Sequence, residues 1–193
     1  MNNKMKTFAL LGVIVLVLVG GSLAYNYLRE QVEPERTLTT SDSDTTATDA
    51  VTEAYPQARD FTVQDIDGND VKLSEQFGKP LVVNFWASWC PPCKEEMPDF
   101  ESVYQEMGEQ VTFMMVNLVD GSRETLETAT DYITANGYTF PIYFDVNQDA
   151  AYTYTITSIP TTLFINAKGE IVASAVGAID AEALKQGIRA ISE

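Results

Sequence analysis

Both cysteines of this chain lie in one stretch, Trp89-Cys90-Pro91-Pro92-Cys93-Lys94, which directly follows the apolar run Leu81-Val82-Val83-Asn84-Phe85-Trp86-Ala87. The run predicts a central strand that is covered on both faces. A buried strand that leads into Cys-x-x-Cys at the start of a helix is typical of thiol–disulfide chemistry. The N–H groups and the dipole of the helix start stabilise a thiolate on Cys90, and Cys93 lies one turn on, close enough to close a disulfide. The spacing therefore predicts a redox protein.

A structural disulfide is the alternative role for this cysteine pair in an oxidising compartment. The loop that it would close is very short, so the bond would remove little conformational entropy from the unfolded chain. The sequence also contains no histidine and no third cysteine. Histidine-ligated zinc, a haem held by histidine, a triad with an imidazole base and a four-sulfur metal site are thereby excluded. We expect a redox-active pair and neither a cofactor nor a metal.

The charge balance of the chain is strongly acidic. Lysine and arginine total 12 against 28 aspartate and glutamate residues, which gives a formal net charge of −16 at pH 7. Such a charge repels nucleic acid and anionic lipid. We therefore expect neither of them as a partner of the soluble part.

The N-terminal segment predicts a membrane anchor. Lys4 and Lys6 precede the uncharged, mainly apolar segment 7–28. This segment is long enough to span a bilayer, and the lysines place its start on the cytoplasmic side. A cleaved signal peptide is the alternative, since Ser22-Leu23-Ala24 is an acceptable cleavage site. A lipoprotein is excluded because no cysteine lies near residue 24. Residues 1–30 are predicted as a single-pass anchor (or an uncleaved signal) in the cell membrane, with the rest of the chain on the extracytoplasmic side.

The following segment, residues 31–56, is rich in Thr, Ser, Asp, Glu and Ala. Few of these residues could bury apolar surface, so we expect a disordered acidic Ser/Thr linker. A flexible coil of about 25 residues spans roughly 25–30 Å on average. Residues 57–193 are then expected to form the folded domain.

Strands and helices alternate along the folded part. Turn residues 67–69 separate two short strand-like runs and predict a β-hairpin. The expected elements, in chain order, are strands Phe61–Ile66 and Val71–Leu73, a helical turn Ser74–Phe77, strand Leu81–Ala87, a helix after Cys90, strand Val111–Leu118, helix Arg123–Asn136, a hairpin of Thr161–Asn166 and Glu170–Gly177, and a helix Ala181–Ile191 capped by Asp180. This order predicts an α/β domain with a mixed central sheet and helices on both faces.

Two separate stretches resemble the thioredoxin fold, namely Phe85–Lys94 and Ile159-Pro160-Thr161-Thr162-Leu163-Phe164-Ile165-Asn166. The pattern Trp-Cys-x-x-Cys-x-x-Glu-x-Pro is similar to that of the membrane-tethered, extracytoplasmic thiol–disulfide oxidoreductases (ResA/TlpA-like). In this chain the pattern falls on Trp89, Cys90, Cys93, Glu96 and Pro98. The resemblance covers roughly residues 59–193. It implies a thioredoxin-like three-layer fold with an N-terminal β-hairpin extension, preceded by a transmembrane helix and a linker.

The resemblance also implies a catalytic role for Glu96. The buried aspartate of cytoplasmic thioredoxins falls at Asn84, which cannot titrate. Cys93 still needs a proton acceptor when it becomes a thiolate. Glu96 follows Cys93 by three residues and so shares its helical face, whereas Glu95 points roughly opposite. The alternatives are a solvated helix charge for Glu96 and a buried amide satisfied by backbone groups for Asn84.

In the implied cycle Cys90 attacks a substrate disulfide, and Cys93 then resolves the mixed disulfide. By resemblance the Ile159–Pro160 bond is cis and faces the cysteines, so that the Ile159 backbone pairs with the substrate chain. An ordinary strand-edge proline is the alternative for Pro160. The residues expected to bind the substrate are Trp89, Pro91, Pro92, Ile159 and Pro160.

The direction of electron flow is expected to be reductive, because Pro91-Pro92 places no charge and no donor between the sulfurs. The resemblance implies electrons from a membrane thiol transporter and clients among exported proteins, such as the haem-binding cysteines of apocytochrome c. Three alternatives remain: a disulfide-forming oxidant, a non-catalytic binding or chaperone module, and a peroxiredoxin-like peroxidase. The last would need a Pro-x-x-x-Thr-x-x-Cys setting, which the residues before Cys90 do not provide.

Overall fold

The computed structural model describes residues 55–192, which belong to one compact unit. The predicted anchor and nearly all of the predicted linker lie outside the described residues. Within residues 55–192, no helix combines the length and the apolar character needed to cross a membrane.

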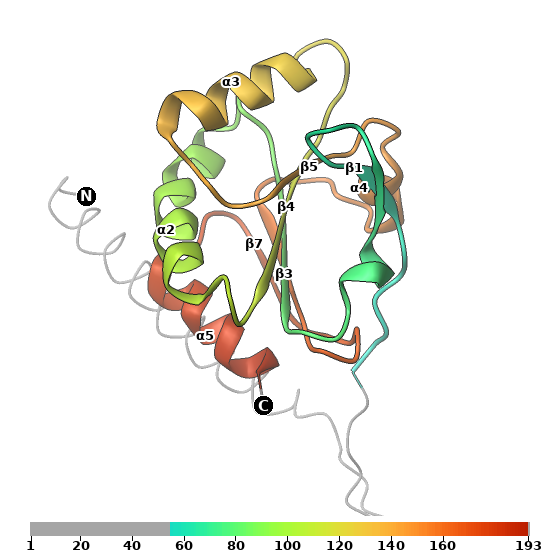
Figure 1. Cartoon of the computed structure of the whole chain (residues 1–193), viewed down its shortest axis with the longest axis vertical. Helices are drawn as coiled ribbons and strands as arrows, with labels where there is room; N and C mark the ends of the chain where they lie inside the picture. Colours follow the sequence, from blue (N-terminus) through green and yellow to red (C-terminus); the bar gives the residue numbers. More distant parts are fainter. Residues whose placement is uncertain (1–54, 193) are drawn as a thin grey trace, which may run out of the picture. The chain divides into compact units, whose positions relative to one another are not determined.

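Seven strands form one mixed sheet in the order β2-β1-β5-β4-β3-β6-β7 (Figure 1). Neighbouring strands run parallel in the pairs β3–β4 and β4–β5, and antiparallel elsewhere. The bounds of the strands are β1 Thr62–Gln64, β2 Asp70–Lys72, β3 Leu81–Trp86, β4 Thr112–Asn117, β5 Ile142–Phe144, β6 Thr161–Ile165 and β7 Ile171–Val176. The expected N-terminal hairpin is present as β1 and β2.

Every residue of β3 is buried, as expected for a strand between two neighbours with both faces covered. Side chains alternate between the faces of a strand. Val82 and Trp86 belong to one core cluster, and Leu81, Val83 and Phe85 belong to the other. This alternation directs β3 side chains at even positions toward the helix that follows the cysteine pair.

Helices cover both faces of the sheet, as predicted. The helical elements are η1 Leu73–Gln76, α2 Pro91–Met107, α3 Leu126–Asn136, α4 Asp149–Thr153 and α5 Ala181–Ile191. Buried side chains of α2, α3 and α5 belong to the core cluster that contains Trp86. Leu73 of η1 and Ala150 of α4 pack in the cluster on the opposite face. Figure 1 shows α2 and α5 to one side of the sheet and α4 to the other.

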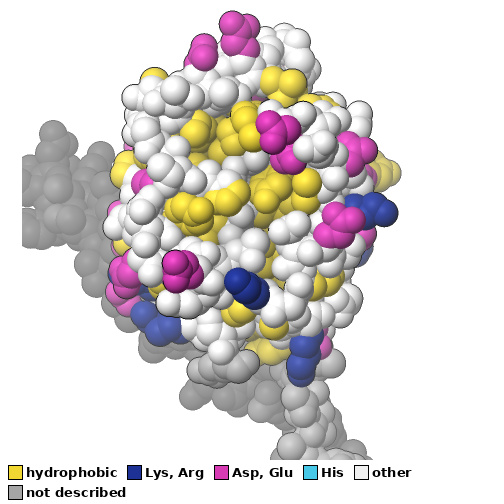
Figure 2. Space-filling view, in the orientation of Figure 1, with side chains coloured by type: hydrophobic (Ala, Val, Ile, Leu, Met, Phe, Trp, Pro, Cys, Tyr) yellow, Lys and Arg dark blue, Asp and Glu magenta, His cyan; other side chains and the backbone are white. Residues whose placement is uncertain are grey.

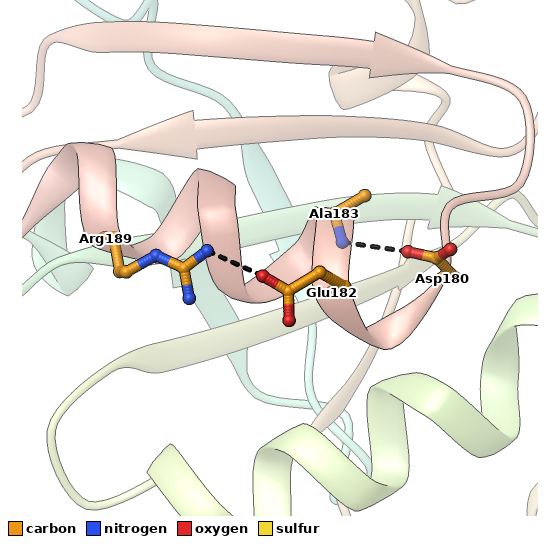
Figure 3. Close-up of polar contacts among 4 residues, drawn as sticks. All are labelled: Asp180, Glu182, Ala183 and Arg189. Atoms are coloured by element: carbon orange, nitrogen blue, oxygen red, sulfur yellow. Dashed lines mark hydrogen bonds and ion pairs between the residues drawn. The ribbon is translucent and has the colours of Figure 1, made fainter.

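The C-terminal helix α5 begins and continues as its sequence predicts (Figure 3). The carboxyl group of Asp180 accepts a hydrogen bond of 2.8 Å from the backbone N–H of Ala183, which is the expected N-cap. Farther along, Arg189 donates to Glu182 at 2.9 Å. The apolar side of the helix buries Leu184, Ile188 and Ile191 against the sheet.

Two elements were not predicted, most strand ends differ from their expected places by one or two residues, and the start of one α-helix was wrong by three. The short strand β5 and the single-turn helix α4 lie in a region for which no element was expected. The helix expected from Arg123 begins only at Leu126. Asp120 is the cause, because its carboxyl oxygen accepts the backbone N–H groups of the three residues from Ser122 to Glu124 and folds them into a turn. Thr125 then caps α3.

The first described residues pack along the turn between β6 and β7. Gln57 forms an isolated antiparallel bridge with Glu170, and the N–H of Ala58 donates to the carbonyl of Gly169 at 2.8 Å. Gly169 has a φ of 82°, and a Cβ there would lie 2.5 Å from the Gln57 side chain. This turn follows Ile165, whose strand partner is Leu81, the first residue of β3. The entry point therefore lies at the end of the sheet opposite to the cysteines.

Candidate active site

The cysteine pair lies where β3 passes into α2. Cys90 is the N-cap residue of α2, and Pro91 and Pro92 occupy the first two helical positions, where the absence of an N–H costs the helix nothing. Cys90 and Cys93 are joined by a disulfide with their Cα atoms 5.3 Å apart, and both are buried. The spacing thus produces the disulfide that the sequence predicted.

The sulfur of Cys90 receives a hydrogen bond from the helix start. The backbone N–H of Cys93 donates to it over 3.2 Å. Pro91 and Pro92 carry no N–H. The first turn of α2 therefore offers the sulfur a single amide donor, fewer than a helix start without prolines would offer.

The segment around Pro160, the second motif, lies next to the sulfur of Cys90. The Ile159–Pro160 peptide bond is cis, as the resemblance implied. The carbonyl oxygen of Ile159 lies 3.7 Å from the sulfur of Cys90. A disulfide sulfur has no proton to donate, so the approach is a contact and not a hydrogen bond. Pro160 is buried and Ile159 is half-buried, so Ile159 is the more accessible of the two.

A shallow, mainly apolar groove runs beside the disulfide. It is lined by Trp89, Leu118, Ile156, Thr157, Ser158 and Ile159. Two of the five residues predicted to bind substrate, Trp89 and Ile159, therefore line one groove. Pro91 is exposed and Pro92 half-buried, and neither is part of the groove lining.

Glu96 is buried on the same side of α2 as Cys93, whereas Glu95 is exposed. Its carboxyl group accepts hydrogen bonds from the side-chain amide of Asn84 at 2.8 Å and from the backbone N–H of Ile179 at 3.1 Å. Burial raises the pKa of Glu96 to about 7, because the two hydrogen bonds offset only part of the cost of burying the charge. The carboxyl group can therefore exchange a proton near neutral pH.

Asn84 is held by side chains and not by the backbone. Its amide nitrogen donates to Glu96 and, at 3.0 Å, to the hydroxyl of Thr162, its partner residue on β6. The alternative of a buried amide satisfied by backbone groups is wrong for this nitrogen. The amide oxygen of Asn84 has no hydrogen-bond partner among the described residues.

Two residues that the sequence analysis did not single out contact the active-site loop (residues 87–90). Glu124 is completely buried and binds Ser88, and the guanidinium of Arg123 lies over the ring of Trp89. No motif marks either residue, since both lie in the loop between β4 and α3. A hint was Asn117, a polar residue that directly follows the apolar residues Phe113–Val116 of β4.

Basic groups are scarce on the protein but present at this site. Figure 2 shows more acidic than basic side chains on the face that it displays. Lys94, which follows Cys93, lies over the ring of Tyr132 at 5.3 Å, and Arg123 lies 3.7 Å from the centre of the Trp89 ring. Both cations thus lie over aromatic rings beside the cysteine pair.

The family model described as the AhpC/TSA family matches residues 55–174. This range contains both cysteines, Glu96 and the cis-proline. The chain belongs to the AhpC/TSA family.

The chain is similar to proteins named as thiol–disulfide oxidoreductases. Sporulation thiol-disulfide oxidoreductase A of Bacillus subtilis is 39% identical over 127 residues, which make up 65% of this chain and 76% of that protein. Thiol-disulfide oxidoreductase ResA of Halalkalibacterium halodurans is 38% identical over 120 residues, 62% of this chain and 66% of that protein. This member of the AhpC/TSA family is a thiol–disulfide oxidoreductase of the ResA/StoA type with a Cys90–Cys93 pair.

Solved structures share the thioredoxin-like fold of this family member. StoA from Bacillus subtilis has a TM-score of 0.59 and 37% sequence identity, covering 67% of this chain and 96% of that one. The exposed lipoprotein thioredoxin Etrx1 of Streptococcus pneumoniae has a TM-score of 0.58 and 29% identity, covering 68% and 98%. The fold class predicted from the two motifs is thereby confirmed.

Proposed function

We propose that this chain is a membrane-anchored reductase that reduces disulfides of exported client proteins on the extracytoplasmic side. Residues 1–30 form the anchor, residues 31–56 the linker and residues 57–193 the catalytic domain. The lysines before segment 7–28 support the orientation. The structural relative Etrx1 is described as an exposed lipoprotein, which supports an extracytoplasmic position. The observation that carries the proposal is the sulfur of Cys90 at the start of α2, 3.7 Å from the carbonyl that precedes the cis-proline.

The proposed cycle transfers two electrons to the client. The thiolate of Cys90 attacks one sulfur of the client disulfide; that S–S bond breaks, a mixed disulfide forms, and the other client sulfur leaves as a thiolate. Cys93, as a thiolate, then attacks the sulfur of Cys90. The mixed disulfide breaks, the second client thiolate leaves, and the Cys90–Cys93 disulfide forms. The two client thiolates take up protons, so the client is reduced and the cysteine pair is oxidised.

Glu96 accepts the proton of Cys93 in this cycle. Cys93 is buried and must lose a proton before it can attack. Glu96 is buried on the same side of α2 with a pKa of about 7, so near neutral pH it can take up a proton without a large free-energy cost. Asn84 tunes this acceptor by donating to it.

The client lies along the groove beside Trp89 and pairs with the backbone of Ile159. The half-buried position of Ile159 and its place in the groove lining support this role. Pro91 and Pro92 contribute the surface between the two sulfurs, and the buried Pro160 fixes the direction of the Ile159 carbonyl.

A reductant is favoured over an oxidant because the helix start stabilises the Cys90 thiolate with only one amide. Electrons come from a membrane thiol transporter. The clients are exported proteins with oxidised cysteine pairs, of which apocytochrome c is one candidate. The name of the Bacillus subtilis relative, a sporulation thiol-disulfide oxidoreductase, offers a client that acts in sporulation as another candidate.

Trapping tests the proposal directly. A full-length Cys93→Ser variant is expected to hold clients as mixed disulfides on Cys90, which mass spectrometry identifies, and Cys90→Ser serves as the matched control. Adducts that persist in Cys90→Ser would overturn the assignment of the nucleophile. A reduction potential well above that of thioredoxin would identify an oxidant instead, and rapid turnover of hydrogen peroxide a peroxidase. Full biological activity of Cys90→Ser would identify a binding module.

A further inference from the structure

The catalytic cycle makes no use of Glu124, although its side chain is buried among the residues that surround the active site. Glu124 lies in the loop between β4 and α3 and is 0% exposed. Burying a carboxyl group is costly unless hydrogen bonds compensate it. Its partners therefore indicate what the residue does.

The hydrogen bonds to the side chain of Glu124 come from Ser88 and Asn117. One carboxyl oxygen accepts the backbone N–H of Ser88 at 2.8 Å and the side-chain amide of Asn117 at 2.6 Å. The other oxygen accepts the hydroxyl of Ser88 at 2.6 Å. Asn117 is the last residue of β4 and pairs with Trp86, the last residue of β3. Glu124 thus links Ser88, two positions before Cys90, to the end of β4, which pairs with the end of β3.

The backbone of Glu124 is itself fixed. Its carbonyl accepts the N–H groups of Asp120 at 3.1 Å and Gly121 at 3.0 Å, and its N–H donates to the Asp120 carboxyl group at 3.0 Å. The carboxyl group therefore projects from a closed turn.

Arg123, the preceding residue, holds the next residue of the active-site loop. Its guanidinium lies 3.7 Å from the centre of the Trp89 ring. Two consecutive residues, Arg123 and Glu124, thus contact two consecutive residues, Trp89 and Ser88, directly before Cys90. In contrast, the loop makes one short backbone bond of its own, from the N–H of Cys90 to the carbonyl of Ala87 at 3.2 Å.

We infer that Glu124 is a positioning residue that keeps Cys90 in its N-cap geometry when the disulfide is open. Reduction removes the covalent link between Cys90 and Cys93, and the hydrogen bond from the Cys93 N–H then depends on where the loop places the sulfur. Glu124 fixes this place through Ser88, and Arg123 assists through Trp89. The inference rests on the proposed role of Cys90 as the nucleophile.

Two substitutions of Glu124 separate the effect of its hydrogen bonds from the effect of its charge. In Glu124→Gln the new amide oxygen can accept both N–H donors, and the new amide nitrogen can donate to the hydroxyl of Ser88, which also accepts hydrogen bonds. The network therefore survives this substitution once the Ser88 hydroxyl turns from donor to acceptor. Glu124→Ala removes all three bonds, and Ser88→Ala removes one of them.

The experiment measures the rate at which iodoacetamide alkylates Cys90 in the reduced full-length chain as a function of pH, with mass spectrometry to assign the modified sulfur. The rate of insulin disulfide reduction is measured in parallel. In Glu124→Ala both rates at neutral pH are expected to fall about tenfold, since a small misplacement of a reacting group has effects of this size or larger. The alkylation profile moves to higher pH. Glu124→Gln is expected to retain the wild-type rates and profile, and Ser88→Ala to fall between the two.

Each outcome decides the inference. Wild-type rates in Glu124→Ala, with the folded state checked by circular dichroism, would overturn it. An equal loss in Glu124→Gln and Glu124→Ala would also overturn it, because charge and not placement would then be responsible. Should Glu124→Ala unfold, Glu124→Gln and Ser88→Ala still test the order of the effects. A wild-type chain whose Cys90 reduces no disulfide would overturn the proposed function, whereas unchanged rates in Glu124→Ala would overturn the inference alone.

Discussion

Two asparagine–glutamate pairs lie on the same face of the sheet, one on each of the parallel strands β3 and β4. Asn84 donates to Glu96 at 2.8 Å, and Asn117 donates to Glu124 at 2.6 Å. Both glutamates are buried, and both asparagines leave an amide oxygen without a partner among the described residues. The pairs are alike in composition and burial, and they differ in the further hydrogen-bond donors to each glutamate.

The remaining donors account for the difference. Glu96 receives one further hydrogen bond, from the backbone N–H of Ile179, and burial then raises its pKa to about 7. Glu124 receives two more, both from Ser88 in the active-site loop. A buried Asn–Glu pair can thus hold a carboxyl group for proton transfer, as proposed for Glu96, or hold a loop in place, as inferred for Glu124; the element that approaches the free side of the carboxyl group makes the difference.

The largest effect is expected from a substitution of Glu96, the glutamate of the first pair. Glu96→Gln removes the proposed proton acceptor of Cys93 and is expected to slow the resolution of a mixed disulfide about 100-fold, the usual order for general base catalysis. The wild-type rate should rise as the pH passes through about 7, since Glu96 must be ionised to accept the proton. The variant should lose this rise. Stopped-flow kinetics measure both, and Glu95→Gln, at the exposed neighbour, is the matched control. A wild-type pH profile in Glu96→Gln would contradict the role of Glu96.

The second prediction concerns stability. The pKa of Glu96 is raised from 4.5 to about 7 in the folded chain, so the folded state binds the proton more tightly than the unfolded state. The stabilising contribution of the protonated group is complete below 4.5 and is lost as the pH rises through about 7. The full loss amounts to about 3 kcal/mol as an upper estimate. Urea unfolding of the oxidised chain at several pH values measures it, and Glu96→Gln should not show the loss. Parallel curves for the two proteins would contradict the prediction.

The third prediction tests the asparagine of the first pair. Asn84→Ala removes a hydrogen bond that lowers the pKa of Glu96, so this pKa should rise further and the kinetic profile should move up by about one pH unit. Thr162→Val is the control, because it leaves the bond from Asn84 to Glu96 in place. An equal displacement of the profile in both variants would show that packing, and not this hydrogen bond, tunes the carboxyl group.

The smallest effect is expected beside the second pair. Arg123→Ala removes the contact between the guanidinium and Trp89, which is worth roughly 0.5–1 kcal/mol at an exposed position. A small decrease in the free energy of unfolding and a change in tryptophan fluorescence should follow. Arg123→Lys is expected to keep part of the contact. A decrease as large as that caused by Glu124→Ala would place the main attachment of the loop at Trp89 rather than Ser88.

The sequence predicted the parts of the fold that local patterns specify. The apolar run of β3, the Cys-x-x-Cys spacing and the Asp180 cap each act over a few residues, and each is present as expected. Short elements escaped prediction. Strand β5 has three residues, and α4 begins where the buried carboxyl group of Asp145 accepts the N–H groups of Ala150 and Ala151. Neither element is long enough to show a periodic pattern.

The sequence predicted the part of the candidate site whose residues lie close together in the chain. Cys90, Cys93 and Glu96 share one helix, so their spacing carries the information. The cis bond before Pro160 came from the family resemblance. Glu124 lies far from the motif in sequence and reaches Ser88 only because β3 and β4 are adjacent and parallel. Such a contact depends on the tertiary structure, and no local sequence pattern predicts it.

The chain enters the domain far from the cysteine pair. Gln57 attaches to the turn after β6, beside the first residue of β3, and the cysteines follow the last residue of that strand. Six extended residues, about 20 Å, separate the two ends. A tether that precedes Gln57 therefore joins the domain at the end of the sheet opposite to the disulfide, and a pull on it acts first on the turn between β6 and β7.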